Sequence, residues 1–203
     1  MNITLQETDA LVLIDVQNDF MPRGALAVPE GEAVIPKIDE LADRFDRIVL
    51  TQDWHPAGHS SFASVHGKSP FETVDMPYGP QILWPDHCVQ GSLGAEIALP
   101  KRIIDKAQAV IRKGFRRQID SYSAFFENDH STPTGLAGFL REQGVTRVVL
   151  AGLATDFCVG FSALDARRCG FETALVQEGC RGIAPDTIAA KMKEMEEAGV
   201  VFV

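Results

Sequence analysis

The feature that most constrains the fold is a regular alternation of short apolar runs with longer segments of helical periodicity. The apolar runs span Ala10 to Val16, Arg47 to Thr51, Ala109 to Arg112, Arg147 to Ala151, Thr173 to Val176 and Val200 to Val203. Most of them carry apolar residues at consecutive positions, which is typical of strands buried on both faces of a parallel sheet. The helical segments between them span Val34 to Phe45, Gly135 to Gln143, Cys158 to Arg168 and Thr187 to Ala198. This alternation predicts an α/β fold, with a three-layer, doubly wound, mostly parallel six-stranded sheet and helices on both faces.

No repeat, low-complexity tract or linker divides the 203 residues, so we expect a single domain over 1–203. The exception to the alternation is an insert at about 53–93, which has little helical or strand periodicity. Four of the five histidines and both tryptophans lie in this insert. Its apolar residues, among them Trp54, Phe62 and Trp84, favour an ordered functional loop over a floppy surface loop.

Charge and composition exclude several classes of protein. The net charge of −9, from 19 basic and 28 acidic side chains, argues against a nucleic-acid partner. No apolar run approaches the roughly 20 residues of a membrane span, and the first residues show no signal-peptide pattern. GxGxxG, complete P-loop, GxSxG and HExxH motifs are missing from the sequence. We therefore expect a cytoplasmic enzyme with a small-molecule substrate, and its oligomeric state stays open.

Side chains that carry chemistry stand at the carboxyl ends of four of the apolar runs. Asp15 lies near the end of the first run, Asp53 and His55 follow the second, Lys113 directly follows the third, and Cys158 follows the fourth. Taken singly, each has an ordinary explanation as a helix cap, a solvated strand end or a small buried side chain. Ligands of open α/β sheets bind outside the carboxyl ends of the strands, so the joint placement predicts a site at this rim.

The histidines of the insert suggest a metal site. Asp53 and His55 are two positions apart in an extended segment, so both side chains point to one face. His87 is the natural third ligand, and one carboxylate with two imidazoles leaves positions open for water or substrate. We expect one divalent transition metal, with zinc first and iron or manganese as alternatives. His59 is either an additional ligand or a hydrogen-bonding histidine.

Cys158 has the surroundings of a nucleophile. Thr155 and Asp156 precede it, and either could cap the helix that follows, which would place the sulfur near a helix N-terminus. The helix dipole and Lys113 would both favour the thiolate. Asp15 could take the thiol proton and later pass it to a leaving group. The remaining cysteines lack such surroundings and are expected to be reduced and structural: Cys88, Cys169 and Cys180.

Five segments of the chain carry a resemblance to a known family. They are DVQNDF at 15–20, TQDWHP at 51–56, WPDHCV at 84–89, RKG at 112–114 and GLATDFCV at 152–159. On these residues the chain resembles the isochorismatase-like cysteine hydrolases over roughly Leu11 to Met195. Aspartate, lysine and cysteine in this order mark the amidase branch of that superfamily. The paired DWH and WPDHC motifs mark its nicotinamidase branch.

The resemblance implies hydrolysis of nicotinamide to nicotinate and ammonia, in NAD salvage, through a cysteine thioester. Pyrazinamide is similar enough in shape to be expected as a further substrate. In this resemblance Cys158 is the nucleophile, Asp15 the general base and acid, and Lys113 their charge partner. Asp53, His55 and His87 would hold the metal, through which the family grips the pyridine nitrogen.

The same resemblance implies a cis peptide bond before Ala154 and an oxyanion hole formed by the backbone N–H groups of Ala154 and Cys158. It leaves undecided whether His59 or Ser60 adds a contact to the metal or its waters. The residues expected to enclose the substrate ring are aromatic: Phe20, Trp84, Tyr122, Phe125 and Phe157.

Two alternatives compete with this interpretation. The first is a related cysteine amidohydrolase that acts on another small carboxamide, although such relatives generally lack the paired metal motifs. The second is a non-catalytic ligand sensor on the same fold, although every expected catalytic position is filled. An isochorismate hydrolase, which cleaves a vinyl ether, would not need Cys158 as a nucleophile.

Overall fold

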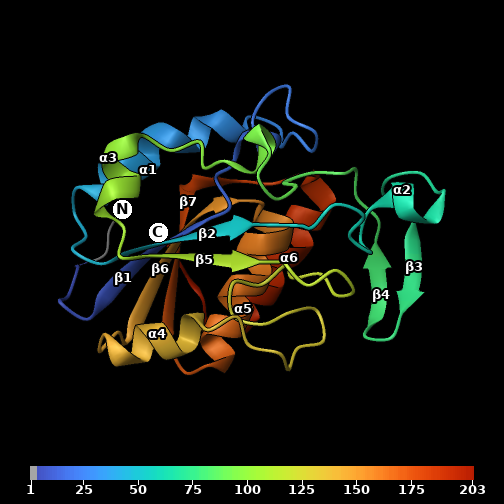
Figure 1. Ribbon diagram of the computed structural model, residues 1–203. Helices are drawn as coiled ribbons and strands as arrows, with labels where there is room; N and C mark the ends of the chain where they lie inside the picture. Colours follow the sequence, from blue (N-terminus) through green and yellow to red (C-terminus); the bar gives the residue numbers. More distant parts are fainter. Residues whose placement is uncertain (1–3) are drawn as a thin grey trace.

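The computed structural model describes residues 4–203 and contains a six-stranded sheet at its centre (Figure 1). Its strands are β1 (Asp9–Ile14), β2 (Ile48–Asp53), β5 (Ala109–Lys113), β6 (Arg147–Leu153), β7 (Glu172–Arg181) and β8 (Val201–Phe202). The order across the sheet is β5-β2-β1-β6-β7-β8, and every neighbouring pair is parallel. The chain therefore winds outward in both directions from β1 and β6, which confirms the predicted doubly wound α/β fold.

Helices cover both faces of the sheet (Figure 1). On one face lie α1 (Val34–Ala42) and α3 (Lys101–Lys106), and on the other lie α4 (Leu136–Glu142), α5 (Gly160–Arg168) and α6 (Pro185–Glu197). Successive residues of β1 show the two faces. Leu11 packs in the core cluster that contains Ile38 of α1, whereas Val12 packs in the cluster that contains Leu140 of α4. Every residue of β1 is buried, as a run of consecutive apolar residues predicts.

The insert is ordered and has secondary structure of its own. It contains the short helix α2 (Ala63–His66) and an antiparallel hairpin of β3 (Thr73–Met76) and β4 (Gly79–Ile82), neither of which the sequence pattern predicts. The hairpin stands to one side of the main sheet (Figure 1). Isolated bridges from His55 to Val89 and from Phe62 to Trp84 join the two ends of the insert.

Short turns complete the described chain: η1 (Asn18–Phe20), η2 (Gly31–Ala33), η3 (Leu93–Ala95) and a π-helical turn, η4 (Thr155–Val159). Over residues 4–203, no helix has both the length and the apolar character that crossing a membrane requires.

The site lies where the strand order reverses. Ile14 of β1 pairs with Gly152 of β6, so the carboxyl ends of these strands lie side by side. A Cβ atom on Gly152 would lie 2.1 Å from the carbonyl oxygen of Ile14, so this approach requires glycine. Asp15 directly follows β1 with a φ of 46°, in the left-handed region. Both chains thus leave the sheet at the reversal point, where open α/β sheets bind ligands.

Candidate active site

The ammonium group of Lys113, at the end of β5, joins the expected catalytic residues in one buried cluster. Its Nζ lies 2.8 Å from Oδ2 of Asp15 and 2.6 Å from Oδ1 of Asp53. It also donates to the carbonyl of Ser121 at 2.8 Å and lies 3.3 Å from Sγ of Cys158. One oxygen of each carboxylate and the sulfur all lie within 4.8 Å of one another. The structure therefore brings Asp15, Lys113 and Cys158 together, as the strand-end pattern predicts.

Burial and charge set the proton affinities of this cluster. Burial raises the pKa of Asp15, and the ammonium of Lys113 opposes that rise. Burial also raises the pKa of the Cys158 thiol well above its usual range, again opposed by Lys113. Burial alone would lower the pKa of Lys113, but the carboxylates of Asp15 and Asp53 outweigh it and hold that pKa well above its usual range. The cluster thus holds a permanent cation beside two groups of raised pKa that can exchange a proton.

A tight π-helical turn presents the cysteine. The carbonyl oxygen of Ala154 accepts hydrogen bonds from the N–H groups of Phe157 and Val159, both at 3.0 Å. Phe157 itself has non-helical backbone angles, φ −124° and ψ −105°. The hydroxyl of Ser162 donates to the carbonyl of Cys158 at 2.5 Å. These contacts fix the backbone of the turn on both sides of the thiol.

The predicted capping of this helix is wrong. Neither Thr155 nor Asp156 makes a side-chain cap to η4 or α5, and α5 begins only at Gly160. The carboxylate of Asp156 turns instead toward a distant segment. It accepts hydrogen bonds from the N–H groups of Ile183 and Ala184 and from the hydroxyl of Thr187, at 3.0, 3.2 and 2.5 Å. Asp156 thus ties the turn that carries Cys158 to the segment before α6 and does not cap the helix.

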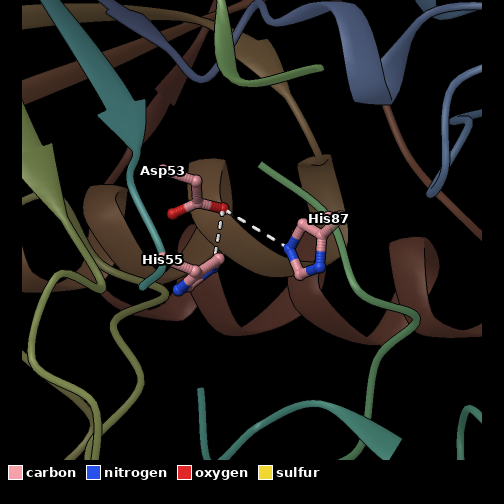
Figure 2. Close-up of side chains that lie close together, drawn as sticks. All are labelled: Asp53, His55 and His87. Atoms are coloured by element: carbon pink, nitrogen blue, oxygen red, sulfur yellow. Dashed lines mark ion pairs between the residues drawn. The ribbon is translucent and has the colours of Figure 1, made fainter. Parts of the chain in front are cut away.

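Asp53, His55 and His87 converge beside this cluster (Figure 2). Oδ2 of Asp53 lies 3.8 Å from Nε2 of His55 and 3.9 Å from Nε2 of His87. The Nδ1 atoms face backbone carbonyls, of Gly114 at 2.9 Å and of Pro85 at 2.8 Å. Because a carbonyl only accepts, both Nδ1 atoms carry the ring hydrogen, and both Nε2 lone pairs face the carboxylate.

This arrangement fits a divalent transition metal. Ligand atoms about 2.1 Å from one ion lie about 3–3.5 Å apart, so a small closure of the three side chains would complete the coordination. Burial lowers the pKa of His55 and of His87 to about 4, which keeps both imidazoles in the neutral form that binds metals. A Cβ atom on Gly114 would lie 2.4 Å from the His55 ring, so glycine is needed at this close approach.

His59 is occupied by hydrogen bonds within the protein. Its Nδ1 accepts from the N–H of Ser61 at 3.2 Å, so Nε2 carries the ring hydrogen. Nε2 lies 2.9 Å from the carbonyl oxygen of Arg116 and 3.1 Å from that of Ile119. The hydrogen-bonding interpretation of His59 therefore describes this structure. The buried hydroxyl of Ser60 has no hydrogen-bond partner among residues 4–203.

A small pocket opens beside Cys158. Of the residues expected to enclose the ring, Phe20, Trp84, Tyr122 and Phe157 line it. The Trp84 ring meets the Phe157 ring edge to face at 4.9 Å, and Tyr122 lies 5.6 Å from Phe157. Ala154 also lines the pocket, and the Leu153–Ala154 peptide bond is cis.

Phe125 is a correction. It does not line the pocket, because its side chain is only 1% exposed and packs in the core between the sheet and α4 and α5. Its ring lies 6.0 Å from that of Phe171. Its N–H bonds to the hydroxyl of Ser123, which turns this part of the loop toward the core while Tyr122 faces the pocket.

Sequence reasoning missed several residues of the site. Leu26, Val28 and Ile183 line the pocket, but an apolar residue in a loop gives no signal for such a role. Asp120 also lines it, and an acidic residue two positions before Tyr122 could have been suspected.

Two further residues support the cluster from within recognised motifs. The hydroxyl of Thr51 donates to Oδ1 of Asp15 at 2.6 Å. The side chain of Gln17 bonds both the N–H and the carbonyl of Asp53, each at 2.8 Å. Gln17 and Thr51 lie inside the DVQNDF and TQDWHP segments, and this position in the sequence could have indicated a role in the site.

Comparison with known proteins places these features in a family. Residues 9–203 match the Isochorismatase domain family. A nicotinamidase of Acinetobacter baylyi is 50% identical over 193 residues, which cover 94% of this chain and 90% of that protein. PnC1 from L. infantum, solved in complex with nicotinate, has a TM-score of 0.86 and 40% identity, covering 100% of this chain and 96% of that one. Pyrazinamidase of Pyrococcus horikoshii, solved in complex with zinc, has a TM-score of 0.80 and 38% identity, with 97% and 98% covered.

Proposed function

Because this chain belongs to the isochorismatase domain family, we propose that it hydrolyses nicotinamide to nicotinate and ammonia, with pyrazinamide as a further substrate. The observation that carries the proposal is the buried cluster of Asp15, Lys113 and Cys158, whose cysteine lines a pocket with aromatic walls. Similarity to a nicotinamidase and to a protein solved with nicotinate supports a pyridine carboxamide as the substrate within the amidase class.

The first half of the reaction forms a thioester. Asp15 takes the proton of the Cys158 thiol, and the Lys113 ammonium, 3.3 Å from the sulfur, stabilises the thiolate. The sulfur attacks the carboxamide carbon, and the N–H groups of Ala154 and Cys158 stabilise the resulting oxyanion. The carbon–nitrogen bond breaks as Asp15 returns the proton to nitrogen, so that ammonia leaves and the acyl group stays on sulfur.

The second half regenerates the thiol. Asp15 removes a proton from a water molecule that attacks the thioester carbonyl. The carbon–sulfur bond then breaks, nicotinate leaves, and the proton on Asp15 returns to Cys158. One group thus serves as base and acid in both halves, which requires a carboxyl whose pKa lies above its usual range, as burial provides for Asp15.

The pocket orients the ring for this attack. Trp84, Tyr122 and Phe157 offer aromatic edges and faces to a small planar heterocycle. A divalent ion held by Asp53, His55 and His87 would supply a Lewis acid for the lone pair of the pyridine nitrogen. Zinc is the metal we propose, supported by the zinc complex of the Pyrococcus horikoshii pyrazinamidase, with iron and manganese as alternatives. A nucleophilic thiol also needs a reducing compartment, so we place the protein in the cytoplasm.

Ammonia release from nicotinamide by the metal-loaded protein tests the proposal. We expect the parent protein to release ammonia and Cys158→Ala to lose activity by roughly 10⁴-fold or more, because the covalent route is closed. Cys169→Ala is the matched control, since Cys169 lies partly exposed just beyond α5, and it should keep full activity. Activity retained by Cys158→Ala would exclude the thioester route. A parent that is silent on nicotinamide but active on another small carboxamide would favour the related amidohydrolase instead.

A further inference from the structure

Gln81 lies on strand β4 of the hairpin and is fully buried, which is unexpected for a polar residue on a hairpin outside the main sheet. It is 0% exposed, whereas the other residues of 73–82, all described by the structure, are exposed or half-buried. The hairpin stands to one side of the main sheet (Figure 1), so its buried contact is made by a polar amide instead of an apolar side chain. A buried amide is stable only where its donors and acceptor are paired.

The amide of Gln81 is paired on both sides. Its Nε2 lies 3.0 Å from Oδ2 of Asp120 and 2.9 Å from the hydroxyl of Tyr122, and it also donates to the carbonyl of Ile82 at 2.7 Å. Its Oε1 accepts from the hydroxyl of Tyr78 at 3.2 Å and from Nδ2 of Asn128 at 3.1 Å. The amide therefore joins the hairpin to the loop that follows β5.

Two of these partners line the pocket. Asp120 and Tyr122 both face the space beside Cys158, and the Tyr122 ring meets the Trp84 ring edge to face at 6.1 Å. Asn128 fixes the same loop with two further hydrogen bonds. Its Oδ1 accepts from the N–H of Tyr122 at 2.9 Å, and its backbone N–H donates to the carbonyl of Asp120 at 2.8 Å. The hydroxyl of Tyr122 is thus fixed at its far end by Gln81, and the tilt of the ring is fixed with it.

We propose that Gln81 is a positioning residue that sets the wall of the ring-binding pocket through Tyr122 and Asp120. This inference rests on the proposed function, because the wall matters only if an aromatic carboxamide binds there. The hydrogen bonds of Gln81 within residues 4–203 reach neither the nucleophile nor the proposed metal ligands, so its removal loosens ring binding and leaves the thiol chemistry in place. Loss of binding shared by the ground state and the transition state raises KM and leaves kcat unchanged.

The test uses two substitutions with different chemistry. Gln81→Met keeps the approximate volume and removes every hydrogen bond of the amide. Gln81→Glu keeps the acceptor for Tyr78 and Asn128 but places a carboxylate against Asp120. We expect both to raise KM for nicotinamide by about ten-fold with kcat within about three-fold, as the loss of one or two buried hydrogen bonds implies. Inactivation of Cys158 by iodoacetamide, which has no ring, should proceed at the parent rate.

Gln108→Met is the matched control for a purely structural effect. The Gln108 side chain accepts from the N–H of Ile48 at 2.7 Å and donates to the carbonyl of Asp46 at 2.6 Å, at the other end of the sheet from the pocket. It should lower the unfolding temperature without changing KM. If a Gln81 variant is too unstable to purify, Tyr122→Phe removes the hydroxyl partner alone, and it should weaken nicotinamide binding to a Cys158→Ala background by a comparable factor.

The outcomes separate the inference from the proposed function. Binding of nicotinamide to Cys158→Ala that is equally tight with and without Gln81→Met, measured by calorimetry, overturns the role of Gln81 while the proposed function stands. A parallel fall of kcat and of the iodoacetamide rate would show a general loss of structure and would equally overturn it. Failure of Cys158→Ala itself to bind nicotinamide would remove the proposed function and this inference together. Weaker binding with an unchanged alkylation rate supports both.

Discussion

Lys113 makes contacts that a surface lysine could not make. Its ammonium neutralises one of two carboxylates that are buried with it, so the cluster keeps a net negative charge that a proton can offset. Buried ion pairs rarely stabilise a fold, because desolvation cancels much of the attraction. Here the arrangement serves proton transfer instead. Burial and the negative charge of the neighbouring carboxylates both raise the pKa of the Cys158 thiol and of Asp15, and the ammonium of Lys113 limits both rises.

At the metal cluster, His87→Ala tests the ligand set directly. The variant leaves Asp53 and His55 as the two remaining ligands, so we expect it to lose most of the zinc that the parent retains on dialysis against a weak chelator. His130→Ala, which changes an exposed histidine outside the site, should retain metal like the parent. Metal content is measured by elemental analysis, independently of activity. Equal zinc in both variants would show that His87 is not a ligand.

Single residues were predictable where chemistry follows a strand end. Asp15, Lys113 and Cys158 each stand beside a run whose strand identity is clear, and parallel strands bring their carboxyl ends to one rim. Loop residues were not predictable in this way. Phe125 and Tyr122 are three positions apart in an irregular segment, and hydrogen bonds to Ser123 and Gln81 decide which of them faces the pocket.

At the scale of elements, the buried strands and the longer helices could be predicted, and the short exposed elements could not. Six consecutive buried positions give β1 a clear signal, whereas β3 alternates between exposed and half-buried residues, and β4 contains a proline and buries only the polar Gln81. β7 runs to Arg181, beyond the predicted end at Val176, because a register shift against β6 accommodates exposed polar residues. The apolar pattern of a sequence indicates which segments are buried in the sheet. It does not indicate how far a strand pairs, because pairing depends on the partner strand.

Asp156 provides the prediction at this scale, because it joins two elements. Its carboxylate accepts three hydrogen bonds from the start of α6 and the loop before it, and Ile183 of that loop lines the pocket. Asp156→Ala removes a buried, charged acceptor that three hydrogen bonds share, so we expect it to lower the free energy of unfolding by about 2–3 kcal/mol. Denaturant unfolding measures this change.

Asp186→Ala is the control for Asp156. Asp186 is an exposed acidic residue in the first turn of α6, and its loss should cost no more than about 1 kcal/mol through the helix dipole. Equal effects of the two substitutions would mean that the hydrogen bonds of Asp156 do not hold the turn to α6.

At the scale of the whole molecule, the site exists only when the full sheet is assembled. The proposed base follows β1, the nucleophile follows β6, Lys113 ends β5, and the metal ligands come from the end of β2 and from the insert. Sequence separations of about a hundred residues are closed by this topology, and no local segment contains a working site. Stability and the electrostatics of the site are therefore coupled, and pH is a direct probe of the coupling.

The metal-free protein should lose stability as pH falls from about 6.5 to about 4. Burial lowers the pKa of His55 and of His87 to about 4, whereas both titrate near 6.5 in the unfolded chain. Between these values the unfolded state binds more protons than the folded state, so the free energy of unfolding rises with pH. The slope is about 1.4 kcal/mol per pH unit for each histidine. The raised pKa of Asp15 acts in the opposite direction, because the folded state then binds more protons at this group than the unfolded state.

Urea unfolding of chelator-treated protein at intervals between pH 7 and pH 4.5 measures this dependence. We expect the free energy of unfolding to fall steeply across the range, and a variant with His55→Gln and His87→Gln to show a much flatter profile, because its amides do not titrate. His130→Gln should keep the parent slope, since that side chain is exposed in both states. A parent profile as flat as that of the double variant would mean that both imidazoles titrate alike in the folded and the unfolded state, so that burial does not lower their pKa values.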